Sequence, residues 1–239
     1  MTIHTRTLDY MHGDVHCQGY FAHDDGVSGS RPGILIAHTW AGCDEFVQDK
    51  ARQLAGLGYA ALALDLYGGG KVGSGPEENG QLMGVLMGNR PLLQARMLAG
   101  LEALRRQPVV DAARVAAMGF CFGGLCVLDL ARSGADVRGV ISFHGLFTPP
   151  EPHPGQSIKA KVLVLHGNDD PMATPEQAVA LGREFTQYGA DWQIHQFGNT
   201  VHAFTNPRAN DPVFGTVYSP LADRRSWRYL RDFLAEVLE

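Results

Sequence analysis

The segment Gly119-Phe120-Cys121-Phe122-Gly123-Gly124 decides how the rest of this chain is interpreted. It follows a short apolar run, residues 114–118, and precedes a stretch with helical spacing that begins near Leu125. A Gly-x-nucleophile-x-Gly pattern between a strand and a helix is typical of a nucleophile elbow, here with cysteine in the position that serine often holds. Such a sharp turn strains its central residue, so glycine is expected at 119 and 123, where a Cβ atom would collide with the turn.

The elbow places Cys121 at the start of a helix, where the N–H groups and the helix dipole favour the reactive thiolate. A buried cysteine in a glycine-rich turn of a nucleotide-binding fold is the alternative interpretation. The chain contains no G-x-G-x-x-G or G-K-[ST] pattern beside this turn, which disfavours it. Cys126 lies about one helical turn further on, and we expect it to pack in the core rather than to react.

A thiol nucleophile needs a base and a group that orients the base, and in this kind of fold the chain order is nucleophile, acid, histidine. The acid is expected in the segment HGNDDP, residues 166–171, directly after a buried apolar run. Asp169 and Asp170 both qualify, and we favour Asp170 because Pro171 restrains its backbone. His202 follows the last expected strand and is the candidate base.

Three other histidines, His38, His144 and His166, each end an expected strand. None follows the acid segment, so we expect them to line or support a pocket rather than act as the base. The first strand ends in His38-Thr39-Trp40-Ala41-Gly42. The loop after that strand supplies one backbone N–H to an oxyanion hole and the residue after the nucleophile supplies the other, which assigns these donors to Trp40 and Phe122.

Short apolar runs alternate with longer amphipathic stretches along most of the chain, which predicts an α/β fold with a mostly parallel, twisted sheet and helices on both faces. We expect one domain over residues 1–239, with antiparallel edge strands around residues 16–22 and a glycine-rich surface loop at residues 68–75. The expected strands are residues 33–38, 59–64, 114–118, 140–143, 162–165 and 192–196. The expected helices are residues 46–57, 91–106, 125–131, 175–188 and 224–237.

The bulk composition excludes several classes of protein. The 239 residues are 45% hydrophobic and 19% charged, with a net charge of −5. Nucleic acid and anionic membranes both require clustered Lys and Arg, so neither is an expected partner. No signal peptide or transmembrane run is recognisable. The four cysteines show neither a disulfide framework nor a zinc-binding C-x-x-C pair, which favours the reducing cytoplasm and predicts no metal site.

The chain resembles the dienelactone hydrolase family of α/β hydrolases through GFCFGG at residues 119–124, HGNDDP at 166–171 and VHAF at 201–204. The run from ILIAH to ALALDLYGGG, residues 34–70, is also similar, so the resemblance covers nearly the whole chain. It implies a triad of Cys121, His202 and Asp170, no cofactor, and hydrolysis of small ester or lactone substrates. The oligomeric state is expected to be monomer or homodimer.

The chain departs from the pattern of the best-known members at two places. Their Glu in the loop after the first strand is replaced by Thr39, and an Arg shortly after the histidine is replaced by Asn206, with Arg208 nearby. Arg96 is a further candidate for binding a substrate carboxylate. The substrate-binding residues that we expect are Thr39, Tyr67, Arg90, Phe204 and Arg208.

These departures and the soft sulfur nucleophile motivate a further hypothesis, hydrolysis of phosphotriesters, because a neutral P=O group can enter an oxyanion hole. Two rival functions stay open. One is a non-catalytic ligand-binding module built on the same fold. The second is a redox role for Cys121 with Cys126, whose separation across the elbow is unfavourable for a disulfide.

Overall fold

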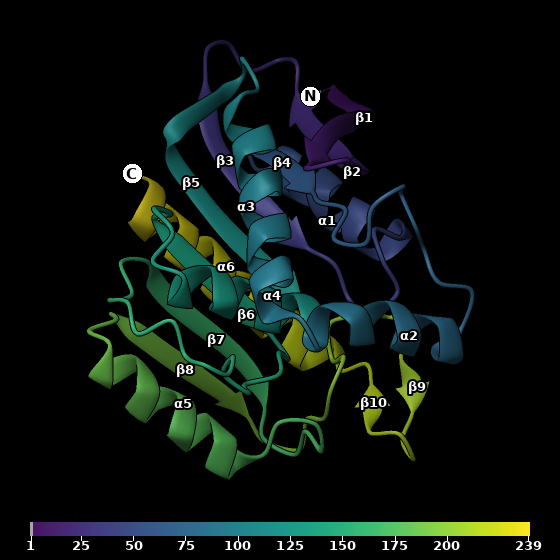
Figure 1. Ribbon diagram of the computed structural model, residues 1–239, viewed down its shortest axis with the longest axis vertical. Coiled ribbons are helices and arrows are strands. Elements are labelled where there is room, and N and C mark those ends of the chain that lie inside the picture. Colours follow the sequence, from purple (N-terminus) through teal and green to yellow (C-terminus); the bar gives the residue numbers. More distant parts are fainter. Residues whose placement is uncertain (1) are drawn as a thin grey trace. The chain divides into compact units, whose positions relative to one another are not determined.

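The computed structural model describes residues 2–239 and contains two compact units, one ending at Met118 and the other comprising Gly119–Glu239. Both combine strands with covering helices (Figure 1). The single domain expected over residues 1–239 stays a prediction. Within residues 2–239 no helix combines the length and the apolar character needed to cross a membrane.

The first unit contains strands β1 (Ile3–His12), β2 (Val15–Asp24), β3 (Arg31–Ala37), β4 (Ala60–Ala63) and most of β5 (Val110–Phe120), in the order β1-β2-β4-β3-β5. The first two strands form a long antiparallel hairpin at the N-terminal edge (Figure 1). Strand β2 runs antiparallel to β4, and β3 runs parallel to β4. The expected antiparallel edge on a parallel sheet is therefore confirmed.

Helices α1 (Glu45–Ala55) and α3 (Arg90–Arg105) cover opposite faces of this sheet. Arg52 of α1 donates a 2.8 Å hydrogen bond to the Tyr20 hydroxyl, so Tyr20 faces α1. A Cβ atom on Gly100 of α3 would lie 3.6 Å from Leu35, which is in register, through β4, with Phe21. Because neighbouring residues of a strand point to opposite faces, the helices that contact the Tyr20 and Phe21 sides lie on different faces.

One helix, α2 (Pro76–Met87), was not expected from the sequence. We predicted a glycine-rich loop up to residue 75 and no element directly after it. Pro76 in the first turn, followed by Glu77 and Glu78, is a favourable helix start. Gly80 and Gly84 weaken the helical pattern that follows, which explains why the helix escaped notice.

The glycine loop is organised by the buried side chain of Asp65. Its Oδ1 accepts hydrogen bonds from the N–H groups of Tyr67 and Gly68, at 3.0 and 2.7 Å. Its Oδ2 accepts from the N–H groups of Gln18 and Gly70, at 3.0 and 2.8 Å. A charged acceptor that satisfies four backbone donors fixes the path of the loop, and with it the position of Tyr67.

The second unit contains parallel strands β6 (Gly139–Phe143), β7 (Lys161–Gly167) and β8 (Trp192–Phe197), with helices α4 (Phe122–Arg132), α5 (Pro175–Gln187) and α6 (Pro220–Leu238) (Figure 1). A Cβ atom on Gly124 of α4 would contact Ser142, whereas one on Gly139 would contact Phe233 of α6. Residues 139 and 142 point to opposite faces of β6, so α4 and α6 cover different faces. Helices on both faces were expected, and they are found within each unit.

A buried arginine ties the helices on one face of the second unit together. The guanidinium of Arg132, on α4, donates to both carboxylate oxygens of Glu184 on α5, at 2.7 and 2.9 Å. It also donates to Asp129 and to the Phe147 carbonyl, each at 3.1 Å. Because its donors meet two carboxylates and a carbonyl, the fully buried charge is compensated, and the loop that follows β6 is held beside α4.

A small antiparallel hairpin precedes α6. Strands β9 (Asn210–Asp211) and β10 (Thr216–Val217) have two residues each, and neither was expected from the sequence. Two-residue strands carry too little periodic pattern to be recognised. This hairpin holds the segment that contains His202.

Candidate active site

The backbone at Cys121 has the strained geometry expected of an elbow. Its φ of 57° and ψ of −118° lie in a region that residues other than glycine rarely adopt. A Cβ atom on Gly119 would lie 2.0 Å from the Gly123 carbonyl oxygen, so no other residue fits at position 119. The Cys121 N–H donates to the Phe143 carbonyl at 3.0 Å, which fixes the turn against β6. Helix α4 begins at the next residue, Phe122.

Asp170 and His202 are brought together although 32 residues separate them in the chain. His202 Nδ1 lies 2.7 Å from Asp170 Oδ2, and both side chains are buried. The second carboxylate oxygen of Asp170 accepts a 2.8 Å hydrogen bond from the Met172 N–H, which orients the acid. Asp169 is exposed, and its carboxylate accepts from the Asn168 side chain instead. Of the two acids considered, it is Asp170 that contacts the histidine.

His202 is also coupled to the thiol of Cys121. Burial by itself lowers the pKa of His202, but the negative charge of Cys121 and hydrogen bonds with Asp170 and Cys121 raise that pKa to about 10. The second ring nitrogen, Nε2, is buried. An imidazole charged at neutral pH beside a sulfur favours a thiolate–imidazolium pair.

The backbone of His202 is held by the β9–β10 hairpin. Its N–H donates to the Gly215 carbonyl at 3.0 Å, and its carbonyl accepts from the Val217 N–H at 3.1 Å. Gly215 has a φ of 80°, and a Cβ atom there would lie 2.3 Å from Pro171, the residue after Asp170. Gly215 therefore contacts both the acid loop and the histidine loop. The sequence signal, a single Gly in the segment Asp-Pro-Val-Phe-Gly, indicates only a turn.

Two of the additional histidines support this site. His144 has a φ of 36°, its Nε2 lies 2.8 Å from the Thr205 hydroxyl, and its ring packs edge-on against His202 at 5.1 Å. His166 is fully buried and packs on Phe147 at 4.9 Å. Burial lowers the pKa of His166, and the charge of Asp170 partly opposes this effect. His144 therefore packs directly against the His202 ring, and His166 lies close enough to Asp170 for that charge to act on its pKa.

In the first unit, the expected oxyanion and substrate-binding residues cluster in one region. His38 is buried, and burial lowers its pKa to about 4. Its Nδ1 lies 2.6 Å from the Thr39 carbonyl, while its Nε2 accepts from the Leu66 N–H at 3.3 Å. The Tyr67 hydroxyl donates to the Trp40 carbonyl at 2.8 Å. These hydrogen bonds hold the loop that follows β3 in place. Since its pKa is low, His38 makes its bonds as a neutral ring.

The remaining expected substrate-binding residues differ in exposure. Arg90, the first residue of α3, is buried, and Arg96 is buried beside Cys17 and the Leu66 carbonyl. Phe204 is fully buried and packs edge-on against His144 at 5.1 Å, whereas Arg208 is exposed. Their roles toward a substrate stay predictions.

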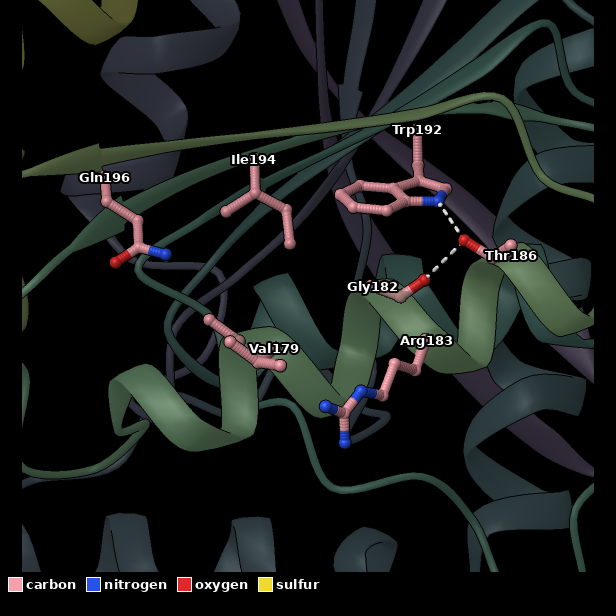
Figure 2. A pocket seen from close by; sticks show the side chains of 8 residues that line it. Val179, Gly182, Arg183, Thr186, Trp192, Ile194 and Gln196 are labelled. Carbon is pink, nitrogen blue, oxygen red and sulfur yellow. Dashed lines mark hydrogen bonds between the residues drawn. The ribbon is translucent and has the colours of Figure 1, made fainter.

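A surface groove lies elsewhere in the second unit, between α5 and β8 (Figure 2). Trp192 forms one side of it, and its indole N–H donates to the Thr186 hydroxyl at 3.0 Å. Val179 and Ile194 face the groove from the two elements. The candidate triad does not line it, and the Thr186 hydroxyl there is bonded to the Gly182 carbonyl and the Trp192 indole rather than to a base, so this groove is not treated as a rival catalytic site.

The parallel strands with covering helices, the elbow and the acid–histidine pair define an α/β hydrolase. The family model described as "Dienelactone hydrolase family" matches residues 17–238, and the chain belongs to that family.

Similar proteins agree with this assignment. The crystal structure of a dienelactone hydrolase-like promiscuous phosphotriesterase from metagenomic libraries has 38% sequence identity and a TM-score of 0.95, with all of both chains covered. A protein of Aquifex aeolicus named for an expected carboxymethylenebutenolidase activity is 23% identical, over 97% of this chain and 98% of its own. A Bradyrhizobium protein named for an expected 2-oxo-3-(5-oxofuran-2-ylidene)propanoate lactonase activity is 25% identical, over 86% and 85%.

The first prediction concerns Gly215. We expect Gly215→Ala to lower kcat for an ester substrate about 10- to 100-fold, because the new Cβ displaces Pro171 and misaligns the Asp170–His202 pair. Gly189→Ala is the matched control, since Gly189 also has a positive φ but no atom within 4 Å of its Cβ position. Both variants should lose about 1–2 kcal/mol of unfolding free energy because alanine is strained at a positive φ, and Gly215→Ala should lose more because its Cβ also collides with Pro171. Equal kcat values in the two variants would contradict the positioning role.

The second prediction concerns the charge state of His202. Because the charge of Cys121 raises the pKa of this imidazole, Cys121→Ala should lower it by about 1 to 3 pH units. In the wild type, His202 should therefore stay protonated up to about pH 10. In the Cys121→Ala variant, it should lose its proton at a lower pH. Titration of the imidazole resonances by NMR measures both values. A pKa that is the same in both proteins would show that the sulfur carries no charge beside His202.

Proposed function

We propose that this protein hydrolyses small carboxylic esters or lactones, with Cys121 as nucleophile, His202 as general acid and base, and Asp170 as the group that orients His202. One observation carries the proposal. An elbow presents Cys121, a buried Asp170–His202 pair belongs to the same unit, and the charge of the Cys121 sulfur raises the pKa of His202. A structural cysteine in a turn requires no such partner. The family membership supports a hydrolase.

In the first step, the Cys121 thiolate attacks the carbonyl carbon and the carbonyl oxygen takes up the negative charge. The tetrahedral intermediate then collapses, and the bond to the leaving oxygen breaks as His202 gives that oxygen its Nε2 proton. The product is a thioester on Cys121 and an alcohol. With a lactone, the alcohol stays attached to the acyl group.

In the second step, neutral His202 takes a proton from water as the water oxygen attacks the thioester carbonyl. The carbon–sulfur bond breaks, the carboxylic acid leaves, and the thiolate–imidazolium pair returns. Asp170 holds the imidazole by its Nδ1 side in both steps, so that Nε2 always faces the reacting atoms. No cofactor takes part in this scheme.

The oxyanion is proposed to be held by the backbone N–H groups of Phe122 and Trp40. Phe122 is the first residue of α4, where N–H groups point out of the helix and the helix dipole favours negative charge. The loop that contains Trp40 is held by the Tyr67 hydroxyl and by His38. Preorganised donors of this kind contribute about 3–4 kcal/mol each to the stability of the transition state.

The names of two relatives point to lactones as the substrate class. We propose Thr39, Tyr67, Arg90, Phe204 and Arg208 as the residues from which the substrate pocket is built, Arg90 and Arg208 being candidates for a substrate carboxylate. We place the enzyme in the cytoplasm, where the four free thiols stay reduced. A monomer or a homodimer fits the proposed chemistry equally well.

The third prediction tests the nucleophile. Cys121→Ala should lower the rate of p-nitrophenyl acetate hydrolysis at least about 1,000-fold, because the covalent route is lost. Cys126→Ala is the matched control, since Cys126 is buried in α4 one turn away, and it should keep most of the activity. Mass spectrometry of the wild type during turnover should show one acetyl group on Cys121.

The same experiment separates the proposal from its rivals. If both folded proteins hydrolyse the ester at equal rates, or neither does, the elbow is not the working site and the ligand-binding module becomes the better interpretation. A disulfide between Cys121 and Cys126 would instead appear as a two-hydrogen mass difference on reduction.

We propose a second activity, slow hydrolysis of phosphotriesters at the same site. It is favoured by the 38% identity to a promiscuous phosphotriesterase over the whole of both chains. It is also favoured by Thr39 in place of the family's acid. The thiolate would attack phosphorus, expel the aryl alkoxide with the His202 proton, and leave a phosphorylated thiol that water must hydrolyse.

The fourth prediction follows. The wild type should release nitrophenol from diethyl p-nitrophenyl phosphate more slowly than from the acetate ester, and Cys121→Ala should release none above background. Cys126→Ala again serves as the control. Absence of release by the wild type at high enzyme concentration would overturn the second activity and leave the ester hydrolase intact.

A further inference from the structure

A second group of reactive side chains lies in the first unit, at the open end of the β1–β2 hairpin. His4 of β1 and His23 of β2 are direct cross-strand partners, so their side chains lie on the same face of the hairpin. Their ring centroids are 5.2 Å apart. Asp25 follows β2 by one residue, and its Oδ1 lies 2.9 Å from His23 Nε2. One ligand atom from each of the three residues lies within 4.8 Å of the others.

The backbone around these side chains is fixed before any ligand arrives. The Asp25 N–H donates to the Thr2 carbonyl at 3.0 Å, which ties the end of β2 to the start of β1. The Asp24 carboxylate accepts from the N–H groups of Thr2 and Gly26, each at 3.0 Å. His23 is 9% exposed, whereas His4 and Asp25 are exposed and free to turn. One rigid ligand and two adjustable ones are therefore held on a fixed scaffold.

Two imidazoles and a carboxylate suit a borderline divalent cation better than Ca²⁺ or Mg²⁺, which prefer oxygen ligands. Tetrahedral Zn²⁺ with bonds of about 2.0–2.2 Å separates its ligand atoms by roughly 3.3 Å. Rotation of the exposed His4 and Asp25 side chains closes the remaining gap around His23. The fourth position would be left to water.

The charges around the cluster also suit a cation. Arg31 is the nearby positive group, and its guanidinium donates to the carbonyls of Asp24, Val27 and Gly29. The carboxylates of Asp24 and Asp25 lie beside it and supply negative charge at the cluster.

We propose that His4, His23 and Asp25 form a binding site for a divalent transition-metal cation such as Zn²⁺, which joins the two ends of the N-terminal hairpin. The cation takes the place of the contact between His23 Nε2 and Asp25 by binding the Nε2 lone pair, and the single proton of the neutral ring then lies on Nδ1. The spacing of the cysteines predicts no metal site, and it gives no signal for this one. His4 lies about twenty residues from His23 and Asp25 in the chain and meets them only through the cross-strand register.

The fifth prediction tests this site with Zn²⁺ alone, by isothermal titration calorimetry. All proteins carry Cys121→Ala, so that the thiol does not compete for the cation. The parent protein, which carries Cys121→Ala alone, should bind one Zn²⁺ per chain with a Kd of about 1–50 μM. His4→Ala and His23→Ala should each weaken binding at least about tenfold. His4 is exposed, so its variant keeps the test valid if His23→Ala disturbs folding.

His16→Ala is the matched control. His16 and Asp9 form an exposed histidine–carboxylate pair on the same hairpin, 2.7 Å apart, and they lack a second histidine opposite. This variant should bind Zn²⁺ as tightly as its parent, and Zn²⁺ should shift the NMR signals of His4 and His23 but not of His16. Absence of saturable binding up to about 1 mM Zn²⁺, or equal weakening in all three variants, would overturn the proposal.

Discussion

The close approach of Gly119 to the Gly123 carbonyl is the constraint on which the candidate site depends. Glycine has no Cβ atom, so at position 119 it allows the chain to leave β5 and enter α4 in a single turn, with Cys121 at the apex of that turn. Any larger residue would collide with the Gly123 carbonyl. The strain at Cys121 is held by neighbours on either side, through the bond from its N–H to Phe143 and through the packing of α4 on β6. The fully buried Arg132 then joins α4 to α5, so the helix that begins at the nucleophile cannot shift by itself.

Two kinds of interaction hold the candidate base, His202: one acts on its ring and the other on its backbone. Its ring is held by charge, between the Asp170 carboxylate and the sulfur of Cys121. Its backbone is held by two hydrogen bonds to the β9–β10 hairpin, and Gly215 links that hairpin to the proline after Asp170. The aromatic edge of His144 covers the same ring. Electrostatics therefore select the protonation state of His202, and the backbone contacts determine where the ring lies.

The sequence predicted the larger elements and the three candidate catalytic side chains, because each carries a strong local pattern. Buried strands read as continuous apolar runs, and the elbow needs glycine at fixed offsets. The choice of Asp170 over Asp169 followed from Pro171, and the structure brings Asp170 to His202. The features that escaped prediction are non-local, too short, or interrupted by glycine. Helix α2 is weakened by two glycines, β9 and β10 have two residues each, and the His4–His23 pair exists only in the cross-strand register.

The β9–β10 hairpin, which holds the backbone of His202, is short, and Val213 and Phe214 are exposed at its tip. A segment with so few interior contacts opens at a lower free-energy cost than the strands and helices that surround it. Opening it would release His202 from its backbone bonds while the rest of the protein stays folded. Heat or mild denaturant should then abolish turnover before the global unfolding transition begins, and cooling should restore it. If the hairpin opens first, the working lifetime of the enzyme depends on the eight residues from Asn210 to Val217 rather than on the stability of the core.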